Sequence, residues 1–332
     1  MLRVAVNGFG RIGKLAVRIL MQCDDVEVVA INNTTDLEGI AYNYKYDSVH
    51  RTLDCDAKYE DGYLVIDGKK IKIVSDYEAE NLPWKELNID LVFECTGAFT
   101  KYEDAYKHIK AGAKKVLISA PGKGDMKTIV FGVNEDILDG TEEVVSAASC
   151  TTNCLAPVLK CLNDNFGISH GFMSTVHAMT NDQETLDRPH KKGINARRGR
   201  AASLSIIPTT TGAASTIGKV IPELEGKLDG CAFRVPSADG SLLDLTLELK
   251  KDVTKEEINE TFKKNANYVL KYTDDPIVSA DIIGNVCGAL IDGNLTNVVE
   301  TDGKKLVKVV AWYDNEMGYT AQMIRTGLSM FK

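Results

Sequence analysis

The chain lacks several features that would assign it to a specialised class of protein. No run of about 18 apolar residues occurs among its 332 residues, so the sequence predicts no transmembrane helix. It has no Cys-x-x-Cys pair and no matching histidine spacing, so we expect no metal site. Internal repeats and low-complexity tracts are also missing, and 44% hydrophobic residues is ordinary for a globular protein, which excludes a disordered or collagen-like chain.

An excess of positive charge is absent too. Lys and Arg number 39 against 47 Asp and Glu, a net charge of −8, so the chain has no overall attraction for nucleic acid or an anionic membrane. Any anionic ligand must therefore be bound by local donors. Residues 1–3 run directly into an apolar strand pattern without a basic leader, and the eight scattered cysteines suit a reducing compartment, so we expect a cytoplasmic protein.

The length favours two domains of roughly 150 residues each. A strand over 3–7, a helix over 12–21 and a strand over 26–31 form a βαβ unit of about 30 residues. Further buried parallel strands are expected at residues 91–94, 116–119 and 144–145. They alternate with helical stretches such as 102–111. This pattern predicts a Rossmann-type, doubly wound parallel sheet.

From about Cys150 the pattern changes. A helix over 151–165 comes first, and four strand patterns follow at residues 171–177, 230–235, 242–250 and 305–313. They predict an α+β domain with a mostly antiparallel sheet and helices on one face. Residues 180–203 form a long charged loop, and loops of that length in a compact enzyme are usually functional. Residues 315–331 are typical of an amphipathic helix.

Residues 8–13 match the dinucleotide fingerprint G-x-G-x-x-G. Gly8 permits the tight turn, Gly10 lets a pyrophosphate approach the backbone, and Gly13 allows the helix to pack closely on the strand. The helix N-terminus then faces the anion. Because the motif lies between a predicted strand and a predicted helix, it predicts a site for NAD or NADP; a purely structural glycine turn is the alternative.

Cys150 lies in Ser-Cys-Thr-Thr-Asn-Cys-Leu-Ala-Pro, after a strand and at the start of a helix. The positive end of a helix lowers a thiol pKa, so we expect a thiolate at pH 7. A lone cysteine would better be interpreted as a buried apolar side chain, but this segment is far more specific and favours a nucleophile. Cys154 lies one helical turn later, on nearly the same face, where a buried structural thiol is the simpler interpretation.

Five further segments accompany this one, at residues 7–13, 45–50, 180–183, 208–214 and 312–316. With residues 148–154, they resemble the phosphorylating glyceraldehyde-3-phosphate dehydrogenase family over essentially the whole chain. The resemblance implies oxidation of D-glyceraldehyde 3-phosphate to 1,3-bisphosphoglycerate with reduction of NAD or NADP, in glycolysis or gluconeogenesis. It also implies a homotetramer, with an NAD(P)-binding domain of residues 1–149 and 316–332 and a catalytic domain of residues 150–315.

By this resemblance Cys150 adds to the aldehyde to give a thiohemiacetal and then a thioester, which inorganic phosphate attacks. His177 is the base that activates the thiol and steadies the oxyanion. The substrate phosphate is assigned to Thr180 and Arg234, with Arg198 between the two anion sites. The residues implied for the inorganic-phosphate site are Ser149, Thr151, Thr211 and Gly212.

The resemblance also implies a set of cofactor contacts. Asn315 holds the nicotinamide carboxamide, with Tyr319 packed nearby. Thr96 and Ser119 lie beside the adenosine and nicotinamide regions. The full set implied for the cofactor is Asn7, Gly8, Gly10, Arg11, Ile12, Gly13, Asn33, Thr96, Ser119, Arg188, Asn315 and Tyr319.

Two departures from the family pattern concern the choice of cofactor. The family's strand usually ends Ile-Asn-Asp, whereas this one ends at Asn33, and the long loop carries Arg188 where Leu or Ala is usual. In the family this loop reaches the adenosine ribose of a neighbouring subunit. One change removes a negative charge and the other adds a positive one, so we expect NADP or dual use; an exposed Arg188 with ordinary NAD use is the alternative. The loop is also about three residues longer, through residues 193–195.

Two other functions remain open on the sequence. Erythrose-4-phosphate dehydrogenase is a relative that hydrolyses its thioester, although residues 209–212 favour a site for inorganic phosphate. A binding role for RNA or a partner in the nucleotide crevice is a non-enzymatic alternative, which the acidic net charge disfavours.

Overall fold

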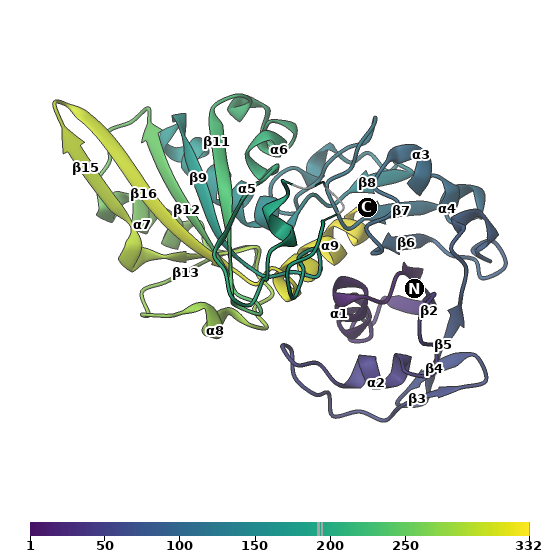
Figure 1. Ribbon diagram of the computed structural model, residues 1–332. Coiled ribbons are helices and arrows are strands. Elements are labelled where there is room, and N and C mark those ends of the chain that lie inside the picture. The colour runs from purple at the N-terminus through teal and green to yellow at the C-terminus, as the bar shows by residue number, and fades with distance from the viewer. Residues whose placement is uncertain (191–192, 194, 332) are drawn as a thin grey trace. The chain divides into compact units, whose positions relative to one another are not determined.

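The computed structural model describes residues 1–190, 193 and 195–331. The chain divides into two compact units, one of residues Met1–Ser149 with the C-terminal residues from Thr320, the other of Cys150–Tyr319 (Figure 1). Helix α9 (Met317–Ser329) therefore begins in the second unit and ends in the first. The sequence had suggested residue 316 for this boundary, before the helix rather than within it. None of the described helices is long and apolar enough to cross a membrane.

The first unit is built on an eight-stranded sheet with the order β3-β4-β5-β2-β1-β6-β7-β8. Its strands are β1 (Leu2–Asn7), β2 (Val26–Asn32), β3 (Ala57–Glu60), β4 (Tyr63–Ile66), β5 (Lys69–Val74), β6 (Leu91–Glu94), β7 (Lys115–Ile118) and β8 (Val144–Ser146). From β5 to β8 every neighbouring pair is parallel, which confirms the predicted Rossmann-type sheet.

The antiparallel edge of this sheet, β3-β4-β5, was not predicted. Two Asp-Gly turns close its hairpins, at Asp61-Gly62 and Asp67-Gly68, and all four residues have positive φ. Asp-Gly between short strands is a strong hairpin signal, so the pattern was present in the sequence. The strands themselves are only four to six residues long and partly exposed, which weakens their hydrophobic pattern.

Short helices accompany the sheet of the first unit. They are α1 (Arg11–Leu20), α2 (Ile40–Lys45), α3 (Tyr102–Ala105) and α4 (Lys107–Lys110), with 3-10 turns η1 (Ala79–Asn81) and η2 (Glu135–Ile137). The helix expected over 102–111 is thus two short helices. Within this unit α9 packs on β6, because a Cβ on Gly327 would lie 2.7 Å from the Phe93 ring. Gln322 Nε2 of the same helix donates to the Phe131 carbonyl at 3.0 Å.

The second unit contains a sheet of order β10-β11-β9-β12-β16-β14-β13, with β15 paired to β16. Its strands are β9 (Ile168–Ala178), β10 (Ile207–Thr210), β11 (Leu228–Val235), β12 (Ser241–Leu249), β13 (Leu270–Thr273), β14 (Ala289–Asp292), β15 (Asn297–Thr301) and β16 (Lys304–Tyr313). Apart from the parallel pairs β9-β11 and β13-β14, the pairing is antiparallel, as predicted.

Helices cover one face of this second sheet. They are α5 (Cys150–Phe166), α6 (Ala213–Val220), α7 (Lys255–Lys264) and α8 (Ser279–Ile282), with 3-10 turns η3 (Arg197–Gly199), η4 (Pro222–Leu224) and η5 (Gly293–Leu295). Helix α5 packs on β9, β12, β14 and β16 and has α6 and α7 beside it. Alternation along β9 sends Met173, Thr175 and His177 to the buried face and leaves Phe172 and Val176 exposed.

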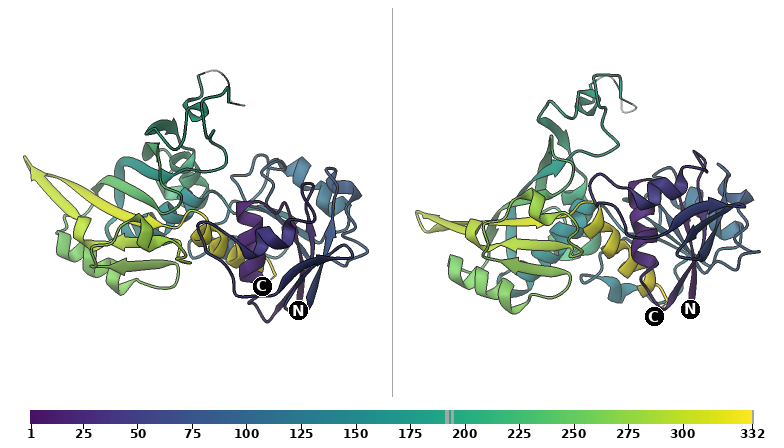
Figure 2. Two further views of the ribbon diagram at one scale, coloured as in Figure 1. Left: turned by 60° about the horizontal axis from the view of Figure 1, so that its bottom comes forward. Right: turned by 90° about the horizontal axis from the view of Figure 1, so that it is seen from below.

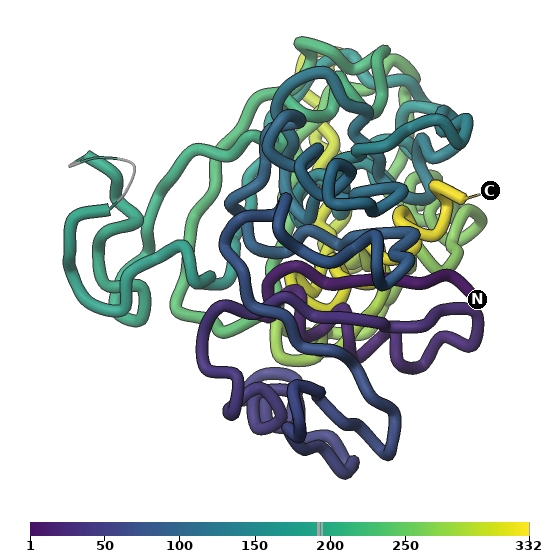
Figure 3. Tube along the Cα trace, turned by 90° about the vertical axis from the view of Figure 1, so that its right-hand side faces the viewer, coloured from purple at the N-terminus to yellow at the C-terminus, as the bar shows by residue number. Residues whose placement is uncertain are grey.

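Two parts of the second unit extend away from its sheet. The β15-β16 hairpin is a long ribbon closed by Asp302-Gly303, both with positive φ (Figure 2). The loop that follows β9 also projects away from the strands of this unit (Figure 3). Ile194, part of the expected extension of that loop, lies outside the described residues.

The glycine-rich turn shows why the first helix begins where it does. Gly8 has a φ of +92°, and a Cβ placed on Gly13 would lie 1.9 Å from the Gly8 carbonyl oxygen. Gly10 has open space around it, because a Cβ there would meet no atom within 4 Å. Gly13 is therefore required for packing, and Gly10 leaves room at the N-terminus of α1.

We predict that Gly13→Ala lowers the free energy of unfolding by about 1–3 kcal/mol, because α1 must move away from the turn. Gly10→Ala is the matched control and should unfold like the parent protein, since its Cβ meets nothing. Urea denaturation followed by circular dichroism measures both. Equal stability of the two variants would contradict this account of the packing.

Candidate active site

A pocket of about 470 Å³ opens in the first unit at the carboxyl ends of β1, β2 and β6. Of the residues expected at the cofactor, five line it: Asn7, Gly8, Gly10, Asn33 and Thr96. Its other lining residues are Phe9, Asn32, Thr34, Thr35, Asp76, Tyr77, Ala79, Leu82, Cys95, Ala98 and Phe99. Dinucleotides bind in crevices of this kind at the carboxyl ends of parallel strands.

A buried hydrogen-bond network forms the floor of this pocket. The Glu94 carboxylate accepts from the Thr96 main-chain N–H at 2.8 Å, and its other oxygen lies 3.1 Å from His108 Nε2 and bonds Asn7 Nδ2. Asn7 Oδ1 in turn accepts from Asn32 Nδ2 at 2.7 Å. Glu94 is not among the residues that the sequence predicted for this site. A carboxylate at the end of a buried strand was the available signal.

The first turn of α1 is tied to the rest of the unit by ion pairs. Arg11, from the fingerprint, and Lys14, just after it, both form 2.5 Å ion pairs with Asp47. Burial alone would raise the pKa of Asp47, but hydrogen bonds from these two cations and from the main chain bring it well below its usual value. The Arg11 side chain is therefore held by Asp47. Ser119 directly follows β7, and its N–H donates to the Glu94 carbonyl at 2.9 Å.

The second unit brings the predicted nucleophile and base together. Cys150 is the first residue of α5, and His177 is next to last in β9. Cys150 Sγ lies 3.3 Å from His177 Nε2. The register of β9 with β11 places Arg234 directly beside His177 on the same buried face. A strand pair and a helix terminus therefore fix this geometry.

The surroundings of His177 keep its imidazole neutral and correctly oriented. His177 Nδ1 lies 2.7 Å from the Ala178 carbonyl, to which it donates, so Nε2 is left to accept the thiol proton. Arg234 Nη1 approaches Nδ1 to 3.0 Å and donates to the Ala178 carbonyl at 3.1 Å and to Thr180 Oγ1 at 3.2 Å. Burial and then the positive charge of Arg234 lower the pKa of His177 to about 3.

Opposing influences act on the pKa of the Cys150 thiol. Desolvation raises it, whereas the charge of Arg234 and the hydrogen bonds to Thr151 lower it, and the net direction is upward. This direction opposes the thiolate expected from the helix terminus, because a sequence pattern contains no measure of desolvation. His177 Nε2 lies where it can take the thiol proton as the sulfur attacks.

Tyr313, which we had not singled out, joins the two elements that carry this pair. Its buried hydroxyl lies 3.1 Å from Thr151 Oγ1, at the start of α5, and 2.8 Å from Thr175 Oγ1 on β9. Its ring packs edge-on against the His177 imidazole, with centroids 5.9 Å apart. The sequence signal was its position in the segment 312–316, which we had assigned to the cofactor through Asn315 alone.

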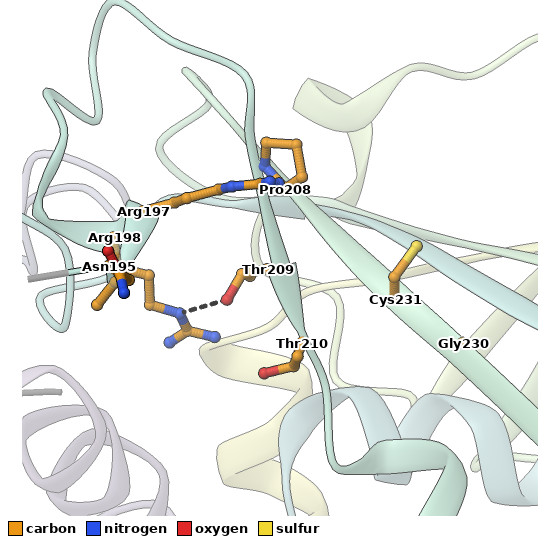
Figure 4. Close-up of a pocket in the computed structure, with 9 residues that line it drawn as sticks. Asn195, Arg197, Arg198, Pro208, Thr209, Thr210, Gly230 and Cys231 are labelled. Carbon is orange, nitrogen blue, oxygen red and sulfur yellow. Dashed lines mark hydrogen bonds between the residues drawn. The ribbon is translucent and has the colours of Figure 1, made fainter. Parts of the chain in front are cut away.

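The residues predicted around the substrate phosphate fall into two places. Thr180 and Arg234 are in contact beside His177. Arg198 forms a 2.5 Å ion pair with Asp182 and donates to Thr209 Oγ1 at 3.3 Å, beside a pocket of about 600 Å³ (Figure 4). That pocket is lined by Asn195, Ala196, Arg197, Arg198, Pro208, Thr209, Thr210, Gly230 and Cys231.

The other predicted residues have individual settings. Gly212 precedes α6, and Thr211 Oγ1 accepts from the Ala213 N–H at 3.2 Å. Arg188 is exposed, with its Nε 3.5 Å from the Glu184 carboxylate. Asn315 and Tyr319 are both buried. Ile12 and Gly13 begin α1 in the first unit, and Ser149 immediately precedes α5.

The fold and these side chains define a dinucleotide-binding protein whose second unit carries a thiol–imidazole pair. Two family models match the chain. The one described as glyceraldehyde 3-phosphate dehydrogenase, NAD binding domain, matches residues 2–102, and the C-terminal domain model of the same family matches residues 149–315. The chain belongs to the glyceraldehyde-3-phosphate dehydrogenase family.

Similar proteins cover almost its full length. The chain is 56% identical over 326 residues to glyceraldehyde-3-phosphate dehydrogenase of Clostridium pasteurianum, covering 98% of this chain and 97% of the relative. The protein of the same name from Clostridium acetobutylicum is 55% identical over 326 residues, with the same coverage. That of Streptococcus pyogenes is 51% identical over 325 residues, covering 98% of this chain and 96% of the relative.

The pH dependence of Cys150 alkylation tests the electrostatics of the site. Only the thiolate reacts with iodoacetamide, so the rate should rise with pH to a midpoint above that of an unperturbed cysteine. Arg234→Gln removes a charge that lowers the pKa of Cys150, and should move the midpoint higher still. Arg197→Gln, which removes an exposed arginine elsewhere in the second unit, is the control. A parent midpoint below the free-cysteine value would contradict this description.

Proposed function

We propose that the chain catalyses the phosphorylating oxidation of D-glyceraldehyde 3-phosphate to 1,3-bisphosphoglycerate, with reduction of NAD or NADP. The observation that carries the proposal is the 3.3 Å contact between Cys150 Sγ and His177 Nε2 in a chain of this family. The proposal assigns the reaction to glycolysis or gluconeogenesis in the cytoplasm, where reducing conditions keep Cys150 a thiol.

The first step is addition of Cys150 to the aldehyde. A bond forms between Sγ and the carbonyl carbon, and the thiol proton passes to His177 Nε2, which is neutral and can accept it. The resulting imidazolium donates a hydrogen bond to the new oxyanion, which stabilises the thiohemiacetal. The Ala178 carbonyl, which accepts from both His177 Nδ1 and Arg234 Nη1, holds the other side of the imidazole and keeps Nε2 directed at the sulfur.

The second step converts the thiohemiacetal to a thioester. A bound nicotinamide supplies the hydride acceptor. The residues present fit such a group, because the turn at Gly8–Gly13 leaves space at the α1 N-terminus and Asn315 Nδ2 is buried without a hydrogen-bond partner in the described part of the chain. The carbonyl re-forms directly from the oxyanion, and His177 keeps the proton that it took from the thiol. A phosphate oxygen then attacks the thioester carbon and gives up its own proton to solvent. The C–S bond breaks, and the His177 imidazolium returns its proton to the Cys150 sulfur.

The proposal places two anions around the Cys150 thiol. Arg234 Nε is buried and has no hydrogen-bond partner among the described residues, which supports its role, with Thr180, in holding the substrate phosphate. Arg198 would lie between the two anions. The residues proposed for inorganic phosphate are Ser149, Thr151, Thr211 and Gly212.

Initial rates with glyceraldehyde 3-phosphate, measured with and without inorganic phosphate, test the reaction. We expect reduction of the cofactor to depend on phosphate, and Cys150→Ser to lower kcat by at least about a thousandfold while dinucleotide affinity is kept. Cys161→Ser, a buried thiol further along α5, is the matched control. Turnover without phosphate would favour the hydrolysing erythrose-4-phosphate dehydrogenase, and full turnover by Cys150→Ser would contradict the mechanism.

We further propose that the enzyme accepts NADP as well as NAD. Asn33 lines the pocket where a carboxylate would repel a 2′-phosphate, and Thr35 Oγ1 donates to Asn33 Oδ1 at 3.1 Å. Among the described residues that line this pocket, the charged one is Asp76, so the lining offers no positive charge to pair with a 2′-phosphate. A positive charge would then come from Arg188 on the long loop of a second copy, as the family resemblance implies.

A homotetramer is part of the same proposal. The outward face of the second sheet exposes Phe172 and Leu306, at 67% and 51% of their surface, together with Val176. Apolar side chains gathered on one sheet face support contact with another copy of the chain. The exposed position of Arg188 suits a role at such a contact.

The cofactor proposal predicts that Asn33→Asp lowers kcat/KM for NADP by at least about tenfold and leaves that for NAD within twofold, since only NADP carries the repelled charge. Arg188→Leu should act in the same direction, and Arg200→Leu is its exposed control. Sedimentation velocity on the same samples must show a tetramer. A strong NAD preference in the parent enzyme, or a monomer, would contradict the proposal.

A further inference from the structure

The amide of Asn315 is held in one orientation by a single hydroxyl. Asn315 is buried, and its Oδ1 accepts a hydrogen bond from Ser241 Oγ at 2.6 Å. Its Nδ2 has no hydrogen-bond partner in the part of the chain that the structure describes. A buried amide donor without a partner costs free energy, so this nitrogen is best explained as a donor kept for a ligand.

The two hydrogen bonds of Ser241 use its hydroxyl both as acceptor and as donor. The Ala178 N–H donates to Ser241 Oγ at 3.0 Å, and Asn315 Oδ1 takes the hydroxyl proton. If the amide turned over, its NH2 group would donate to the second lone pair of Ser241 Oγ, and the proton of this buried hydroxyl would lose that acceptor. Ser241 therefore favours the orientation with the amide oxygen on its hydroxyl and the amide nitrogen turned away.

The main chain around both residues is held independently. Ser241 pairs with Tyr313 in the β12-β16 register, and a Cβ on the preceding Gly240, where φ is +81°, would lie 2.2 Å from the Ser279 carbonyl oxygen. On the other side, the Asp314 carboxylate accepts from the N–H groups of Glu316, Met317 and Gly284 at 2.8, 2.6 and 2.7 Å. With the main chain held, the Asn315 side-chain amide can still rotate, and the hydrogen bond from Ser241 restricts that rotation.

We propose that Ser241 is a positioning residue for the cofactor. Its hydroxyl selects the orientation in which Asn315 Nδ2 donates to the carbonyl oxygen of the nicotinamide carboxamide. The same hydroxyl ties this donor to the main chain of Ala178, the residue after the base His177. The inference rests on the role proposed above for Asn315, and adds that Ser241 decides whether Asn315 acts as donor or acceptor.

A double-mutant cycle tests whether Ser241 acts through Asn315. Ser241→Ala, Asn315→Ala and the double variant are compared by the equilibrium Kd for NAD, measured by isothermal titration calorimetry without substrate. We expect Ser241→Ala to weaken binding about fivefold, the effect of one hydrogen bond. The double variant should bind like Asn315→Ala alone, because no amide remains to be oriented. Additive effects of the two substitutions would overturn the proposal.

A cofactor analogue tests the orientation itself. The 3-acetylpyridine analogue of NAD keeps the carbonyl oxygen but has no NH2 group. The parent protein should bind it and NAD with similar Kd, since Asn315 donates to the shared oxygen. In Ser241→Ala the amide can turn and accept from the NH2 of NAD, so the preference for NAD over the analogue should rise at least about threefold. An unchanged preference would contradict the proposal.

Two controls separate this proposal from the one it rests on. If Asn315→Ala binds NAD as the parent does, the proposed role of Asn315 fails; if Asn315→Ala is weakened and Ser241→Ala is not, Ser241 alone fails. Ser237→Ala is the matched control, because that hydroxyl donates to the Asp239 carbonyl at 2.8 Å. If Ser241→Ala does not fold, Ser241→Cys replaces it, because cysteine is a close isostere and a weaker donor. We then expect the same changes in Kd for NAD and in the preference for NAD over the analogue, but smaller. Binding like that of the parent protein would overturn the proposal.

Discussion

The contact between Arg234 and His177 is the interaction on which the rest of the site depends. The guanidinium approaches the imidazole at Nδ1 and shares the Ala178 carbonyl with it, so the ring stays neutral and its Nε2 faces the sulfur of Cys150. This pairing follows from the register of β11 with β9. Because the two strands are parallel and Arg234 is paired with His177 in their register, both side chains lie on the same buried face of the sheet.

The same buried face continues across the sheet. Thr175 lies two residues before His177 on β9, and Tyr313 on β16 joins it to Thr151 at the start of α5. Ser241, opposite Tyr313, joins the end of β9 to Asn315. These hydrogen bonds position the nucleophile, the base and the proposed cofactor donor, and they leave Arg234 Nε and Asn315 Nδ2 without a partner among the described residues.

The two units build their sites from different parts of the chain: main-chain geometry in the first and side chains in the second. In the first, backbone geometry makes the pocket: strands end at one edge, Gly13 lets α1 approach the turn, and a buried carboxylate at Glu94 fixes Thr96. In the second, side chains make the site, and burial sets their proton affinities. A dinucleotide can be held largely by main-chain groups and helix ends, whereas acyl chemistry needs a thiol and a base at a defined distance.

The sequence alone determined the Rossmann-type sheet and the mostly antiparallel second sheet, because hydrophobic period carries that information. The sequence also singled out Cys150 through its local motif, and the family resemblance added His177 as its predicted partner. Tertiary structure decided the rest. Tyr313 and Ser241 acquire their roles only from partners far away in sequence, and no local pattern contains them. The pKa of Cys150 shows the same division: a helix terminus, which favours a thiolate, is visible in sequence, but the desolvation that raises this pKa depends on which side chains surround the sulfur once the chain has folded.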